Sequence, residues 1–202
     1  MGIYQVKPRF QRSLRGAEVF LVDHRVHPDY VTFAALGLSV CGGVALYTSR
    51  WALWLLLIIP LVAIGRTALN ALDGLVARGT GLARPWGEVL NELCDRLSDV
   101  ALFVGVALAP GSSLFLGAAA LVLMLLSSYV GITSKAAGGP RQYGGVMCKA
   151  DRMILLSIAA VAAAFLPEVH VFSYFLAVLL GGLCLTLFMR LRATYADLQS
   201  CR

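Results

Sequence analysis

Long apolar segments dominate this sequence, and they decide what the chain can fold into. They cover residues 30–47, 51–78, 85–109, 113–134, 146–166 and 169–191, with short polar, Gly-rich or Pro-containing breaks between them. The hydrocarbon core of a bilayer is spanned by about 20 apolar residues in a helix. With 59% hydrophobic residues, 14% charged residues and a mean hydropathy of +0.79, the chain is more apolar than soluble domains are. We therefore expect an all-α integral membrane protein with six transmembrane helices.

The first 26 residues differ from the rest in being basic. Apolar side chains fall on one helical stripe there, away from several arginines; the stripe is Phe10, Leu14, Ala17 and Leu21, and the arginines are Arg9, Arg12 and Arg15. This pattern predicts an amphipathic helix at the membrane interface, with a solvated basic tail as the alternative. We divide the chain into this segment (1–26), the membrane domain (27–195) and a short tail (196–202).

Lys and Arg gather at both termini and in the second and fourth connections, whereas the opposite connections contain only Arg50. Because positive charge stays on the cytoplasmic side, both termini are predicted to be cytoplasmic, in a multi-pass protein of the inner membrane. The same bias accounts for the net charge of +6, so no nucleic-acid partner is expected.

Two of the expected helices carry polar stripes near their cytoplasmic ends. One stripe contains Glu88, Asn91, Glu92, Asp95 and Asp99, and the other contains Arg66, Asn70, Asp73, Gly74 and Ala77. Ionisable groups at this depth are costly in lipid and should face a shared interior. Facing carboxylate and amide oxygens indicate a hard cation such as Mg²⁺. The alternative is a structural ion-pair network in which Arg66, Arg78 and Arg96 neutralise Asp73 and Asp95.

Eight residues then resemble the signature of the CDP-alcohol phosphatidyltransferase family, D-x2-D-G-x2-A-R-x8-G-x3-D-x3-D, with every spacing kept. They are Asn70, Asp73, Gly74, Ala77, Arg78, Gly87, Asn91 and Asp95. The segment HPDYVT (27–32) also resembles the entry to the first helix of that family, and the region from SYVGITSK to KADR (128–152) resembles its fourth-to-fifth connection. The likeness covers nearly the whole chain.

The resemblance implies transfer of a phosphatidyl group from CDP-diacylglycerol to a hydroxyl acceptor, a polyol or polyol phosphate, with release of CMP. It implies two divalent ions, Mg²⁺ or Mn²⁺, held by Asn70, Asp73, Asn91 and Asp95. Asp73 and Asp95 would be the catalytic carboxylates, with Asp95 as general base. The donor nucleotide would lie against Asp73, Gly74, Ala77, Arg78 and Gly87. A homodimer is expected from the family likeness alone.

The first and third acids of the signature are amides here, Asn70 and Asn91. An amide oxygen can ligate Mg²⁺ but brings no charge, so the second ion is expected to bind more weakly. Glu88, Glu92 and Asp99 lie on the same stripe and are candidates to restore that charge. A catalytically silent relative that binds only the nucleotide is the alternative.

Four cations from the later helices are expected beside this site: Lys135, Arg141, Lys149 and Arg152. They suit an anionic acceptor head group, although positive-inside bias alone explains Arg141. Two other functions stay open, a CDP-alcohol donor acting on diacylglycerol and a six-helix transporter. The absence of repeated halves disfavours the transporter, and the sequence does not name the acceptor.

Overall fold

The computed structural model describes residues 13–200, and this part of the chain is helical without strands. The elements are α2 (Arg15–Asp23), α3 (Pro28–Thr48), the 3₁₀ helix η2 (Leu53–Ile58), α4 (Ile59–Gly79), α5 (Pro85–Ala107), α6 (Leu114–Ala136), α7 (Lys149–Phe165) and α8 (Val171–Ser200). The six long helices α3 to α8 correspond to the six predicted apolar segments. α8 continues through most of the segment that was assigned to a C-terminal tail.

Four segments are long and apolar enough to cross a membrane: Pro28–Thr48, Leu53–Gly79, Leu114–Ala136 and Val171–Gln199. The other two long helices are not among these four segments. Helix α5 carries the charged residues of the polar stripe, and α7 has only 17 residues. The structure thus supports a membrane protein, while the passage of α5 and α7 through the bilayer stays a prediction.

Local chemistry sets several helix ends. Pro60 lies in the first turn of α4 and has no N–H to donate backward, and the second predicted helix accordingly begins as the separate 3₁₀ segment η2. Ser113 caps α6 by accepting a hydrogen bond from the Leu116 N–H. At the start of α7, the Cys148 N–H donates to the Asp151 carboxylate over 3.0 Å, which satisfies one free donor of that turn.

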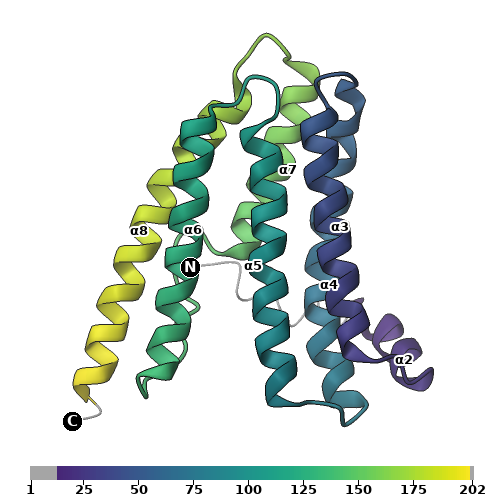
Figure 1. Cartoon of the computed structure of the whole chain (residues 1–202), viewed down its shortest axis with the longest axis vertical. Helices are drawn as coiled ribbons and strands as arrows, with labels where there is room; N and C mark the ends of the chain where they lie inside the picture. The colour runs from purple at the N-terminus through teal and green to yellow at the C-terminus, as the bar shows by residue number, and fades with distance from the viewer. Residues whose placement is uncertain (1–12, 201–202) are drawn as a thin grey trace.

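The bundle has two groups of helices (Figure 1). Helices α4 and α5 both pack on α3 on one side, and α6 and α8 pair on the other. The groups meet where α5 contacts α6 and where α7 contacts both α4 and α8. The apolar core runs through both groups and includes fully buried Phe103, Met124, Leu156 and Leu183. The buried polar side chains include Arg66, Asp73, Asp99 and Arg152, which come from three helices that meet in this arrangement.

Helix α2 lies at the same end of the bundle as the last turns of α8 (Figure 1). It is tied to the end of α4, where a Cβ on Gly79 would meet the Val22 side chain at 2.7 Å. Val19 and Phe20 on α2 are exposed, and no residue of the helix is buried. Three members of the predicted amphipathic pattern, Arg9, Phe10 and Arg12, lie outside the described residues, so the interfacial role of the segment stays a prediction.

Candidate functional site

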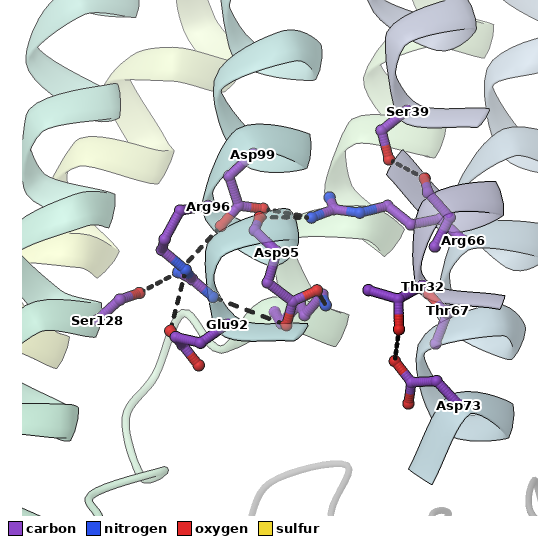
Figure 2. A network of polar contacts seen from close by, with 12 residues as sticks. Thr32, Ser39, Arg66, Thr67, Asp73, Glu92, Asp95, Arg96, Asp99 and Ser128 are labelled. Atoms are coloured by element: carbon purple, nitrogen blue, oxygen red, sulfur yellow. Dashed lines mark hydrogen bonds and ion pairs between the residues drawn. The ribbon is translucent and has the colours of Figure 1, made fainter. Parts of the chain in front are cut away.

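Asp73 is a buried carboxylate on α4, and its side chain has no cation partner among the described residues. One oxygen accepts a hydrogen bond from the hydroxyl of Thr32 on α3 over 3.3 Å (Figure 2). The other accepts from the Gly74 N–H over 2.6 Å. Burying an ionised carboxylate is costly unless it is paired or bound to a metal. Asp73 is therefore held in place by neutral donors and retains lone pairs for a ligand.

Asp95 comes from the facing helix α5, and its environment differs. The Lys149 ammonium, at the start of α7, donates to its carboxylate over 2.5 Å, and Arg96 Nη2 lies 3.9 Å away. Both Asp95 and Lys149 are near enough to act electrostatically on Asp73. The structure thus brings together the two acids that the signature predicts, from α4 and α5, with one lysine beside them.

Asp99, one turn further along α5, is the centre of a buried ion-pair cluster. Its fully buried carboxylate lies 2.7 Å from Arg66 Nη2 and 3.2 Å from Arg96 Nη1 (Figure 2). It also lies 3.5 Å from Arg152 Nη2. The structural ion-pair network that the sequence left open therefore exists, but it is built around Asp99. Among the described residues Arg66 forms no ion pair with Asp73 or Asp95, and exposed Arg78 forms none at all.

The acids of the α5 stripe and the predicted acceptor-binding cations pair one to one. The pairs are Glu88 with Lys135, Glu92 with Arg141, Asp95 with Lys149, and Asp99 with Arg152. We call this set the α5 ion-pair ladder. It runs from an exposed end at Glu88, whose side chain is 54% exposed, to a fully buried end at Asp99.

The connection between α6 and α7 carries Arg141, and α8 holds this connection in place. Arg190 on α8 donates to the carbonyl of Ser127 over 2.7 Å and to that of Gly144 over 2.9 Å. Thr186, one turn earlier, accepts from the Met147 N–H over 2.8 Å. Helix α8 contributes no residue to the predicted site, yet it positions the segment that delivers Arg141 and Lys149.

Sequence reasoning missed three contributors to the site. Thr32 lies within HPDYVT, which resembles the family's entry segment, but its contact with Asp73 depends on how α3 packs on α4. Ser128 accepts a hydrogen bond from Arg96, and Arg190 anchors the α6–α7 connection. Neither belongs to a polar stripe, so no periodic signal pointed to them.

The remaining predicted residues line the same region. Asn70 lies one turn before Asp73, and its side-chain Nδ2 is buried without a hydrogen-bond partner. Asn91 is partly buried one turn before Asp95. A Cβ on Gly74 would lie 3.4 Å from the Arg78 guanidinium, and one on Gly87 would lie 3.6 Å from the Arg84 side chain. Ala77 is partly buried on the exposed end of α4.

These residues can supply part of the ligand shell of a divalent cation. Among residues 13–200, no group of three or more His, Cys, Asp or Glu side chains is arranged to hold a metal ion. The available protein donors are the two carboxylates and the two amides, and turning the Asn70 amide by 180° would place an oxygen where the unpartnered Nδ2 now lies. Mg²⁺ is commonly bound by one or two carboxylates with water and substrate phosphates. The site suits an ion whose shell the substrate completes.

The chain is similar in sequence to known membrane proteins and enzymes. No family model matches the chain. Inner membrane protein YnbA of Escherichia coli is 35% identical over 168 residues, which cover 83% of each chain. The phosphatidylinositol phosphate synthase of Streptomyces avermitilis is 29% identical over 75% of this chain, and the match spans 63% of that enzyme's length.

Two crystal structures of the phosphatidylinositol phosphate synthase of Mycobacterium tuberculosis share the fold. One contains manganese and citrate, with a TM-score of 0.74 over 89% of this chain and 88% of that chain. The other contains CDP-DAG, with a TM-score of 0.75 over 91% of this chain and 94% of that chain; the sequence identity is 25% in both. Together with the sequence relatives, these matches show that the chain belongs to the CDP-alcohol phosphatidyltransferase family.

Proposed function

We propose that the protein transfers a phosphatidyl group from CDP-diacylglycerol to the hydroxyl group of a polyol or polyol phosphate. The observation that carries this proposal is the juxtaposition of Asp73 and Asp95, at signature spacing, on two facing helices of a fold shared with an enzyme that was crystallised with CDP-DAG. The acceptor oxygen forms a bond to the lipid-linked phosphorus, the bond between that phosphorus and CMP breaks, and the hydroxyl proton passes to a base.

Each part of the site has a role in this reaction. Asp95 is the proposed general base, and the proposed ligands of Mg²⁺ or Mn²⁺ are Asn70, Asp73, Asn91 and Asp95. A bound divalent ion neutralises charge that develops on the diphosphate. The nucleotide is proposed to lie along Gly74, Ala77 and Arg78 of α4 and to approach Gly87 of α5, because small residues leave the helix backbones accessible.

The acceptor is proposed to bind at the cations of the α5 ion-pair ladder. Lys135, Arg141 and Lys149 reach α5 from α6, the α6–α7 connection and α7, and Arg152 lies one turn further along α7. Guanidinium and ammonium groups bind phosphate well, so a phosphate-bearing polyol matches this side of the site. An anionic acceptor would replace α5 carboxylates as the partner of these cations.

The location follows from charge. We propose six spans in the inner membrane, with both termini and the site on the cytoplasmic face, because α2, the end of α8 and the basic α4–α5 connection lie at one end of the bundle (Figure 1).

A direct test supplies the purified protein in lipid with CDP-diacylglycerol, Mg²⁺ or Mn²⁺, and a panel of polyols and their phosphates. We expect CMP release that depends on one acceptor class, with phosphate-bearing polyols the most effective. Separate reactions with a CDP-linked polyol and diacylglycerol test the reversed arrangement. Release of CMP only in the reversed reactions, or in none, would overturn the proposal.

A further inference from the structure

The charge at the proposed metal site is smaller than a pair of divalent ions requires. Asp73 and Asp95 supply two negative charges, whereas Asn70 and Asn91 supply none. The Lys149 ammonium bonds to Asp95 at 2.5 Å and interacts with Asp73 as well. The two carboxylates and the Lys149 ammonium together carry a net charge of about −1. Arg96, whose Nη2 lies 3.9 Å from Asp95, adds further positive charge on that side.

Lys149 is held at this position by the fold. It is the first residue of α7, directly after Cys148, whose N–H is capped by Asp151. The residue before that, Met147, is tied to Thr186 of α8 through its N–H. A lysine in the first helical turn gains nothing from the helix dipole, which favours negative charge there. Its contact with Asp95 is the favourable interaction that accounts for its place.

A positive group fixed on Asp95 changes what the site can bind. Two divalent ions in a phosphoryl-transfer site lie about 4 Å apart. Here, an ion on the Asp95 side would have to displace the ammonium or lie beside it, and repulsion between like charges opposes the second arrangement. The Asp73 side has no such competitor among the described residues, and the buried, unpartnered Nδ2 of Asn70 lies on the same helix.

We propose that this site binds one divalent ion, on the Asp73 side, and that the Lys149 ammonium serves as a permanent second cation beside Asp95. The identity of the site rests on the proposed function, but the number of ions does not depend on turnover. Lys149 then belongs to the donor side of the site, and Lys135, Arg141 and Arg152 are left for the acceptor. This revises the two-ion expectation drawn from the sequence.

Counting bound Mn²⁺ tests the proposal. The full-length protein in lipid nanodiscs is titrated with Mn²⁺ in the presence of CDP, and free Mn²⁺ is followed by its electron paramagnetic resonance signal. We expect one bound ion per chain. Lys149→Met should raise the Mn²⁺ affinity about tenfold, since it removes a like charge next to the ion. The triple variant Asn70→Asp, Asn91→Asp, Lys149→Met should bind two ions.

Lys135→Met is the matched control, because it removes a lysine that is paired to the same helix at the exposed end of the ladder. It should leave the ion count unchanged and the affinity within about twofold. Two ions or none per wild-type chain would overturn the proposal, whatever the variants do, as would an unchanged affinity in folded Lys149→Met. CMP release measured on the same sample separates the two claims: an active protein with two ions contradicts only this inference, and an inactive protein with one ion contradicts only the proposed function.

Discussion

Asp73 has the most informative environment of any single residue in this chain. It is 4% exposed, and its oxygens accept hydrogen bonds only from a hydroxyl and a backbone N–H among the described residues. A carboxylate arranged purely for stability would gain more from one of the many arginines nearby, as Asp99 does. The contrast between these two acids separates the proposed ligand from the structural anchor.

Thr32 is expected to act as a positioning residue for Asp73. Replacing it with valine keeps the shape but removes the hydrogen bond, and a bond to a charged group of this kind is worth enough to change ion binding about tenfold. We predict that Thr32→Val weakens Mn²⁺ binding by about that factor, measured by titration in lipid. Thr32→Ser, which keeps the hydroxyl, should restore most of the affinity. Equal affinities in the wild type and Thr32→Val would show that this contact does not orient Asp73.

At the scale of elements, one face of α5 both lines the proposed site and anchors the helix in the bundle. Its carboxylates at Glu88, Glu92 and Asp95 lie toward the partly exposed site, and Asp99 ties the helix to α4 and α7. Removing one partner of a buried ion pair leaves an uncompensated charge and typically costs about 3–5 kcal/mol. How large the loss is depends on how many partners remain.

Asp99→Asn and Arg66→Met should therefore differ in stability. The first change leaves buried Arg66 and Arg152 without a carboxylate, whereas the second leaves Asp99 with Arg96 and Arg152. We predict a clearly larger fall in the thermal unfolding midpoint for Asp99→Asn, with both proteins measured in the same lipid. The opposite order would mean that Asp99 is not the centre of the cluster.

The contact between α3 and α5 sets how closely Thr32 and the acids of α5 approach the site. These helices meet backbone to backbone, since a Cβ on Gly105 would lie 2.4 Å from the Gly43 carbonyl oxygen. Gly42 and Gly43 thus allow close packing of α3 on its neighbours. Gly181 on α8 does not, because a Cβ there would meet nothing within 4 Å.

Gly105→Ala should separate α3 from α5 and destabilise the protein by about 1–3 kcal/mol, as overpacking in a tight core does. Gly181→Ala is the control; it places the same methyl group in open space and removes a flexible residue from a helix, so the unfolding midpoint should hold or rise slightly. The two midpoints, compared with that of the wild type, check this packing. A Gly105→Ala protein as stable as the control would contradict it.

For the molecule as a whole, hydropathy and helical periodicity in the sequence predicted the long helices and the polar stripes of the site. The six apolar segments match α3 to α8, and the signature spacing identified the two facing acids. It did not predict which cation pairs with which acid. Arg66 could reach several carboxylates from its stripe, and the way α4 and α5 both pack on α3 selects Asp99. The contacts of Thr32 and Arg190 likewise depend on tertiary packing between distant helices.

The central claim is that Asp73, as a proposed metal ligand, and Asp95, as the proposed general base, are both needed for transfer from CDP-diacylglycerol. CMP release from CDP-diacylglycerol, measured with the acceptor that proves most effective, tests it in Asp73→Asn, Asp95→Asn and the control Glu168→Gln. Glu168 is exposed on the connection between α7 and α8. This connection lies at the opposite end of the bundle from the connection between α4 and α5 (Figure 1). We predict a loss of about 10²-fold or more in each aspartate variant and no change in the control. Aspartate variants that stay folded and release CMP at the wild-type rate would contradict the account.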